Sequence, residues 1–419
     1  MEDIAYTGNF YRNGSFEELT VYVSNGIIND MRKFRKGEKS VLLEGAVLPG
    51  FTDIHVHFRD PGETEKEDFI TGSTAAAYGG TTTVFDMPNN IIPITDYERF
   101  SRKKAVIEGR SYVDYGLYSM YDGTNGNIVS GESSAIKIFM GGSTNSKGAN
   151  LDYENDSFLR EWPKNIVFHG ELDECLKENN IEEITSLKLH ELSRPSVCEK
   201  EAMRMIMKVR NKNKIVAHLS DWNNLSEKDA TTNIEMTPHH MLLNYSMNIG
   251  SLGKVNPPIR SAQIMRGNLQ SFLDGKIDLL SSDHAPHREE DKEEFEFAKS
   301  GIPGVETRIP LMLALVSRKI LPLSILVKTG AENPAEKFRI MKGKIEKGYY
   351  ADFVCVKFSD ISRINEERLH SKNPRTPFNG FEAVFPHKVI MKGEDLIDGR
   401  DIIEERRGRF MISEKGEAP

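Results

Sequence analysis

Short apolar runs rich in β-branched residues recur through the middle of the chain, and stretches with helical spacing separate several of them. Runs of this length, bounded by turn residues, predict buried strands. Residues 65–80 and 197–213 carry apolar positions at roughly helical spacing, and the pair Gly79-Gly80 is a suitable helix stop. The predicted strands are residues 46–57, 81–86, 113–119, 134–140, 165–170, 214–220, 231–238 and 277–283.

Strands that alternate with helices in this way predict an α/β protein built on a (β/α)8 TIM barrel of about 250 residues. A doubly wound open sheet is the alternative, but no Gly-rich nucleotide fingerprint follows the first strand. The two ends of the chain differ from its middle, because both predict mainly strands. Residues 19–31 predict a hairpin with its turn at Asn25-Gly26, and residues 343–398 contain short strands with glycine turns. We therefore expect residues 1–49 and 341–419 to form one small β-sandwich-like domain beside a barrel of residues 50–340.

Composition narrows the class of protein. The chain has 419 residues, 38% hydrophobic and 28% charged, which is ordinary for a soluble enzyme. Its net charge of −8 argues against a general nucleic-acid surface. The sequence contains no run of about 18 apolar residues, so no membrane span is expected. The N-terminus lacks a signal-peptide pattern. The three cysteines show no CxxC spacing and no even framework, so a reducing cytoplasm is the simplest expectation.

The candidate chemistry lies where the predicted strands end. Side chains alternate along a strand, so His55, His57 and Arg59 point the same way from the end of the first strand. Active sites of (β/α)8 barrels lie at the carboxyl ends of the strands, so polar residues there are expected to converge on one cavity. These residues are His55, His57, Lys137, His169, His218 and Asp283.

Four imidazoles and a carboxylate are suitable ligands for zinc or a similar divalent ion. Four histidines exceed the need of one open catalytic metal, whereas two metals would use them all and need a bridging group. A lysine ammonium has no acceptor, but reaction with carbon dioxide would turn Lys137 into a carbamate that bridges like a carboxylate. The alternatives are a buried Lys137 paired with an acid, and a one-metal site.

The other histidines lack this context. His190, His370 and His387 are interpreted as surface residues, because no predicted strand ends beside them. The pair His239-His240 follows the seventh strand and is assigned a supporting role.

Four motifs in this order, "GFTDIHVHFRDPG", "GGTTTVFDMPNN", "VNPPIR" and "SSDHAPH", resemble the dihydroorotases of the amidohydrolase superfamily. The resemblance covers most of the chain. It implies a (β/α)8 barrel with a small β domain, a binuclear zinc centre, and reversible cyclisation of N-carbamoyl-L-aspartate to dihydroorotate and water in pyrimidine biosynthesis. It also implies a cytoplasmic enzyme with a small-molecule substrate.

The resemblance also implies residue roles. His55 and His57 match ligands of a buried metal, His169 and His218 match ligands of a more exposed one, and Lys137 matches a carbamylated bridge. Asp283 matches a metal ligand that also moves protons. The residues that match substrate contacts are Arg59, Asn89 and His287 at the carboxylate, and Asn256 with the backbone near Pro303 and Gly304 at the ring. Residues 140–150 resemble a mobile loop that covers the substrate.

Three questions stay open on the sequence alone. An allantoinase or a dihydropyrimidinase shares such a metal centre, but its substrate lacks the carboxylate that Arg59, Asn89 and His287 would hold. An inactive scaffold relative would be expected to lose ligands, and here every expected position is filled. A homo-oligomer and association with a transcarbamoylase are both compatible with the sequence.

Overall fold

The structure, a computed structural model, describes residues 3–34, 39–149 and 151–411. Eight strands pair in parallel, each with its neighbour in sequence, to form one sheet. Every residue of these strands is buried, as expected where helices cover a parallel sheet. The strands are β5 (Phe51–Val56), β6 (Thr81–Asp86), β7 (Asp114–Met120), β8 (Ala135–Phe139), β9 (Asn165–His169), β10 (Lys214–Val216), β11 (Thr232–Met236) and β12 (Leu279–Leu280).

The sheet closes on itself between its first and last strands. Val56 forms a parallel bridge with His284, and the amide of His57 donates to the carbonyl of His284 at 2.7 Å. Asp53 strengthens this seam, because its Oδ1 accepts from the amides of both His55 and Ser282 at 3.2 Å. The predicted (β/α)8 barrel is therefore confirmed.

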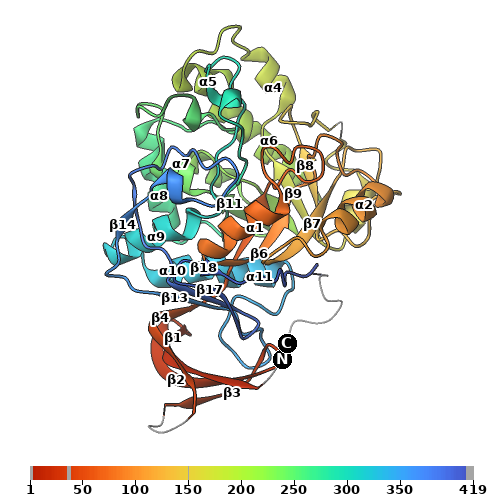
Figure 1. Cartoon of the computed structure of the whole chain (residues 1–419). Coiled ribbons are helices and arrows are strands. Elements are labelled where there is room, and N and C mark those ends of the chain that lie inside the picture. The colour runs from red at the N-terminus through yellow and green to blue at the C-terminus, as the bar shows by residue number, and fades with distance from the viewer. Residues whose placement is uncertain (1–2, 35–38, 150, 412–419) are drawn as a thin grey trace.

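Helices surround the barrel (Figure 1). They begin where the sequence supplies caps: Asp68 accepts from two amides at the start of α1, and Gly79 caps the end of this helix. The helices are α1 (Phe69–Tyr78), α2 (Tyr97–Ile107), α3 (Ser157–Glu161), α4 (Asp173–Glu178), α5 (Leu187–Ser193), α6 (Ser196–Lys208), α7 (Pro238–Leu242), α8 (Ala262–Leu273), α9 (Arg308–Ser317), α10 (Leu323–Val327) and α11 (Asn333–Lys337).

The two ends of the chain build a second eight-stranded sheet, seen below the barrel in Figure 1. The predicted hairpin joins β2 (Ser15–Ser24) and β3 (Ile27–Lys33), and its turn residues Asn25 and Gly26 have φ values of 52° and 80°, the left-handed region that tight hairpin turns require. Phe353 from the tail packs edge-on against Tyr6 and Phe10. In order across the sheet the strands are β18 (Asp401–Ile402), β17 (Glu394–Asp398), β16 (Lys388–Met391), β13 (Phe353–Val356), β4 (Val41–Pro49), β1 (Ile4–Arg12), β2 (Ser15–Ser24) and β3 (Ile27–Lys33). A separate pair is β14 (Ser362–Arg363) with β15 (Glu382–Ala383).

Two sequence predictions need correction here. The apolar run 46–57 is two strands, because the chain leaves the small sheet at Pro49 and enters the barrel at Phe51. A side chain at Gly50, between them, would collide with Thr82 and Asp352. His190 is wrongly interpreted as a surface residue: it is 4% exposed and its Nε2 donates to the carbonyl of Val255 at 2.9 Å.

The interpretation of the cysteines also changes. Cys175 on α4 and Cys198 on α6 form a disulfide. A crosslink that closes a loop of this size typically stabilises a fold by about 3 kcal/mol. Cys355 is a buried free thiol in β13. The prediction that the cysteines form no disulfide framework is therefore wrong for Cys175 and Cys198. The expectation of a reducing compartment loses this support.

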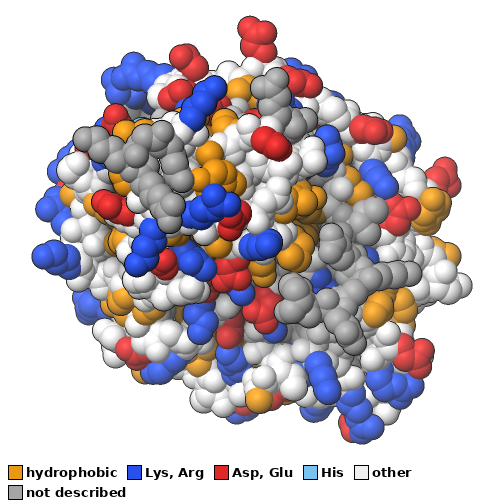
Figure 2. All heavy atoms as spheres, turned by 90° about the horizontal axis from the view of Figure 1, so that it is seen from below, with side chains coloured by type: hydrophobic (Ala, Val, Ile, Leu, Met, Phe, Trp, Pro, Cys, Tyr) orange, Lys and Arg blue, Asp and Glu red, His pale blue; other side chains and the backbone are white. Residues whose placement is uncertain are grey.

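The surface seen from below mixes basic and acidic side chains among the described residues (Figure 2). This mixture agrees with the near balance of 55 basic and 63 acidic residues. The expectation that the protein binds no nucleic acid stays a prediction. Among the helices formed by described residues, none combines the length and apolar character needed to cross a membrane.

Candidate metal centre and substrate pocket

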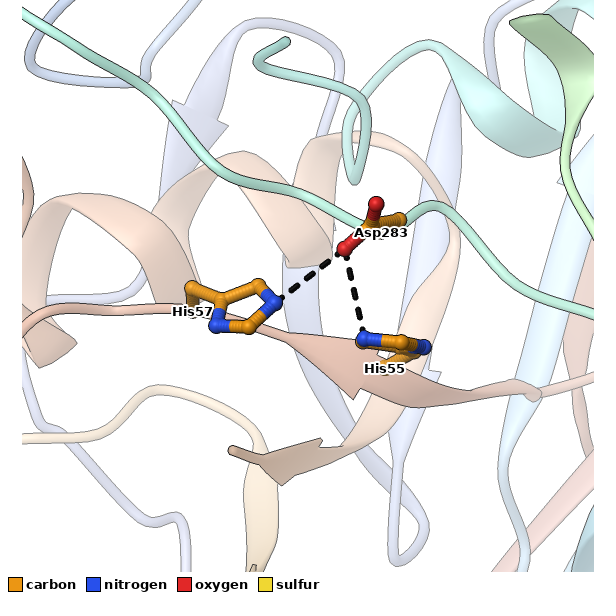
Figure 3. A group of neighbouring side chains, drawn as sticks. All are labelled: His55, His57 and Asp283. Atoms are coloured by element: carbon orange, nitrogen blue, oxygen red, sulfur yellow. Dashed lines mark hydrogen bonds and ion pairs between the residues drawn. The ribbon is translucent and has the colours of Figure 1, made fainter. Parts of the chain in front are cut away.

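Three of the predicted site residues meet at the seam of the barrel. His55 lies in β5, His57 follows it, and Asp283 arrives from the segment after β12 (Figure 3). Asp283 Oδ1 lies 3.2 Å from Nε2 of His55 and 3.1 Å from Nε2 of His57. Burial lowers the pKa of His57 to about 3, so its imidazole is neutral, which is the form that binds metals. Two imidazoles and a carboxylate in this arrangement form a set of three metal ligands.

Glu235 in β11 determines which nitrogen of His55 faces this set. Its Oε1 lies 2.8 Å from Nδ1 of His55, and a carboxylate can only accept, so Nδ1 carries the proton. The lone pair of Nε2 then points at the carboxylate of Asp283. Two electron-rich atoms 3.2 Å apart call for a cation between them, so the donor set fits a metal ion.

A second pair of histidines lies beside the first. His169 Nδ1 is 2.9 Å from His218 Nε2, and the ring of His218 lies 5.2 Å from that of His55. Glu171 Oε2 accepts from Nε2 of His169 at 2.9 Å and is itself held by Arg194 at 2.6 Å. Burial acts to raise the pKa of Glu171, but Arg194 and His169 outweigh it and lower the pKa. Glu171 therefore remains ionised and fixes His169 in the form whose Nδ1 is unprotonated, as a metal ligand must be.

Lys137 in β8 lies among these residues, fully buried. Its Nζ has no hydrogen-bond partner in the part of the chain that the structure describes. Burial lowers the pKa of Lys137 to about 8, against the opposing influence of Glu235 and Asp283. An unpaired amine in this environment does not fit the alternative of a lysine paired with an acid.

Three site residues hold their backbones in the left-handed region, with φ of 61° for Arg59, 40° for His218 and 48° for Asp283. Each such conformation is unfavourable for a residue other than glycine and persists only where the surroundings enforce it. Their concentration at the carboxyl end of the barrel indicates a functional site.

The pocket above this centre is lined by the predicted metal-binding histidines, Asp283, Arg59, Asn89 and Asn256. Arg59 is 3% exposed, and its Nε and Nη1 find no hydrogen-bond partner among the described residues. The side-chain oxygen of Asn89 is likewise without a partner there, while its Nδ2 donates to the carbonyl of Thr144 at 3.0 Å. Buried polar atoms left unpaired in a pocket are suited to a polar ligand.

The remaining predicted contacts lie at the edge of this pocket. Arg59 Nη2 is 3.3 Å from Nε2 of His287, which lines a neighbouring cavity together with Pro303. The amide of Gly304 donates to Nδ1 of His284 at 3.1 Å, so this group is already occupied. The structure therefore brings His287 to Arg59 but does not direct the Gly304 amide into the pocket.

The loop of residues 140–150 contributes Ser143 and Thr144 to the pocket wall. Asn145 Nδ2 donates to Oε2 of Glu63 at 2.8 Å, which ties this loop to the segment after β5. Residue 150 lies outside the described residues, and the mobility of the loop stays a prediction.

Glu235, Glu171 and Arg194 were missed as functional residues. The signal for Glu235 is an acid within an otherwise uncharged buried strand, and the signal for Glu171 is its position two residues after a strand-end histidine. The supporting role of His240 agrees with its hydrogen bonds to Thr237 and to the carbonyl of Pro257.

The chain is similar to known proteins in both sequence and fold. The amidohydrolase family model matches residues 46–256. A dihydroorotase of Thermoplasma volcanium is 52% identical over 98% of both chains, and one of Thermoplasma acidophilum is 50% identical over the same share. Among solved structures, an L-hydantoinase (dihydropyrimidinase) of Arthrobacter aurescens aligns with a TM-score of 0.92 over 99% of this chain and 100% of its own, at 24% identity. At that identity the likeness shows the fold alone.

Proposed function

The chain belongs to the dihydroorotases of the amidohydrolase family, and on this premise we propose how its pocket carries out their reaction. The reaction is the reversible cyclisation of N-carbamoyl-L-aspartate to (S)-dihydroorotate and water, a step of pyrimidine synthesis. The observation that carries the proposal is the convergence of His55, His57 and Asp283 beside the unpaired donors of Arg59.

We propose that these residues hold two zinc ions. His55 and His57 would bind one, His169 and His218 would bind the other, and Asp283 would be a further ligand. Lys137 would bridge the two after its neutral amine attacks carbon dioxide, forming a nitrogen–carbon bond and releasing one proton. The metal pair, when bound, supplies an acidic water and polarises the amide carbonyl.

Asp283 would move the proton. In hydrolysis it takes a proton from the attacking water and returns it to the ring nitrogen as the carbon–nitrogen bond breaks. In cyclisation it takes the proton from the ureido nitrogen as the carbon–nitrogen bond forms, and delivers it to the carboxyl oxygen that leaves as water. Burial acts to raise the pKa of Asp283, but His55 and His57 outweigh it and hold the pKa well below its ordinary value, so the carboxylate is ionised.

Arg59, Asn89 and His287 would bind the substrate carboxylate. A guanidinium offers two parallel donors to a carboxylate, and both unpaired nitrogens of Arg59 are buried. Asn256 would face the ring from the same pocket, with the backbone near Pro303 as a further contact. The ring substrates of an allantoinase or a dihydropyrimidinase lack this carboxylate, which favours a dihydroorotase over those alternatives.

Replacement of the arginine tests this role. Arg59→Met is expected to raise KM for dihydroorotate by about 10- to 150-fold, because it removes hydrogen bonds to a charged group, while zinc content is unchanged. Steady-state kinetics with metal analysis on the same sample measure both. Arg318→Met is the control, since Arg318 pairs with Glu382 at 2.6 Å on the surface and neither residue lines the pocket. An unchanged KM in Arg59→Met would remove the carboxylate role.

The proposal also covers the domain boundaries, the cellular location and the partners of the chain. We propose boundaries near residues 49 and 341 between the barrel and the small sheet, supported by the passage from β4 to β5. A cytoplasmic location is part of the proposal, although the Cys175–Cys198 disulfide weakens the cysteine argument for it. Association with a transcarbamoylase or with further copies of this chain stays a prediction.

A further inference from the structure

Glu67 is a fully buried carboxylate outside the pocket, between β5 and α1. Its Oε2 accepts from the hydroxyl of Ser371 at 2.5 Å and from the amide of Lys372 at 3.3 Å. Its Oε1 accepts from the hydroxyl of Thr71. A buried carboxylate is tolerated where donors surround it, and here they come from α1 and from the segment that follows the barrel.

A further neighbour of Glu67 is His284, whose Nε2 lies 3.3 Å from Oε2. Nδ1 of His284 faces the amides of Gly304 at 3.1 Å and Val305 at 3.3 Å. Amides only donate, so Nδ1 is the acceptor and the proton is on Nε2, directed at Glu67. Both ring nitrogens are thus occupied, and the ring of His284 is fixed.

The backbone of His284 lies in the barrel seam, directly after Asp283. Its carbonyl accepts from the amide of His57 at 2.7 Å, and it bridges Val56. Asp283 has a φ of 48°, a conformation that its neighbours must enforce. The ring of His284 is anchored by Glu67 at Nε2 and by the two amides at Nδ1. These contacts fix His284, and His284 in turn restricts the backbone of Asp283, the residue before it.

We propose that Glu67, acting through His284, is a positioning residue for Asp283, and that residues 371–372 complete this support from beyond the barrel. The proposal rests on the proposed function, in which Asp283 moves the proton. It predicts that loss of the Glu67–His284 contact lowers the rate of the chemical step and leaves substrate binding by Arg59 unchanged.

The test is a double-mutant cycle. Glu67→Gln presents an amide where donors converge, and His284→Asn keeps an acceptor for the two amides but loses the donor to Glu67. Each variant, reloaded with zinc, is expected to lose about 10- to 100-fold in kcat with KM for dihydroorotate within about twofold, as supporting groups of metal ligands do. The double variant is expected to lose no more than either single variant, because both remove one contact.

Glu306→Gln is the matched control. Glu306 is also a buried glutamate that binds the segment after the barrel, through the amide of His370 at 2.7 Å and its Nδ1 at 2.8 Å, but its hydrogen bonds do not include His284. The kcat of Glu306→Gln is expected to stay within about threefold of that of the wild type. Equal kcat losses in Glu306→Gln and Glu67→Gln, a rise in KM alone, or losses that multiply in the double variant would each overturn the proposal.

Two checks keep these outcomes separate. Circular dichroism and Tm establish that each variant is folded; if Glu67→Gln does not fold, His284→Asn alone carries the same expectation. Failure of the proposed function would appear in the wild type, as absent turnover of dihydroorotate. Failure of the positioning role would appear only in the variants.

Discussion

Asp283→Asn is expected to reduce kcat for dihydroorotate hydrolysis by about 1,000-fold, within the range by which a positioned acid or base accelerates proton transfer. Asparagine has nearly the same shape and keeps one oxygen toward His55 and His57, so a metal ligand is retained. It cannot accept a proton from water and pass it to the ring nitrogen. The loss should therefore appear in kcat, with zinc content close to that of the wild type after reloading.

The matched control for this variant lies at the other end of the same strand. Asp278 pairs with Lys228 at 2.7 Å and accepts from the amide of Ile234 at 2.8 Å, away from the pocket lining. Asp278→Asn is expected to keep kcat within about threefold of the wild type. If Asp283→Asn retains more than about a tenth of wild-type kcat, Asp283 is not the group that moves the proton.

Lys137→Ala is expected to lower kcat by at least about 100-fold and to reduce the zinc bound per chain, since loss of a bridging ligand should exceed the effect of losing a supporting group. The buried Nζ has no hydrogen-bond partner among the described residues, so its removal breaks no ion pair that the fold depends on. A small carboxylate such as propionate is expected to restore part of the activity, because it can enter the space vacated by the side chain and replace the carbamate. Kinetics with metal analysis, with and without propionate, measure this.

Lys137→Arg separates the two interpretations of this lysine. Arginine keeps a positive charge but does not form a carbamate, so a bridging role predicts the same loss as in Lys137→Ala. A simple cationic role predicts activity near that of the wild type. Zinc reloading of metal-free wild type should also require bicarbonate, and full reactivation in buffer free of carbon dioxide would contradict the carbamate.

The barrel could be predicted because its strands are buried on both faces. Such strands are continuous apolar runs with clear ends, and the predicted strand 81–86 matches β6 at both ends. The break at Gly50 could not be seen in the pattern, because β4 and β5 are both apolar where they meet. Only the tertiary arrangement shows that the chain crosses there from one sheet to the other.

The ligands of the candidate site could be predicted because they lie at strand ends, where barrel geometry brings distant residues together. Their supporting residues could not, since the pairing of Glu235 with His55 joins positions that no local spacing relates. The same holds for Cys175 and Cys198, 23 residues apart, and for His190, whose burial depends on packing against the segment at Val255.

The central claim is that this pocket opens and closes the dihydroorotate ring with a metal pair. Its most direct test is hydrolysis of dihydroorotate by the purified chain, followed by ultraviolet absorbance, with zinc counted in the same sample. The account predicts turnover with about two zinc ions per chain, and dihydroorotate preferred over hydantoin and dihydrouracil. Two bound zinc ions with ring opening of hydantoin or dihydrouracil but not of dihydroorotate would contradict it.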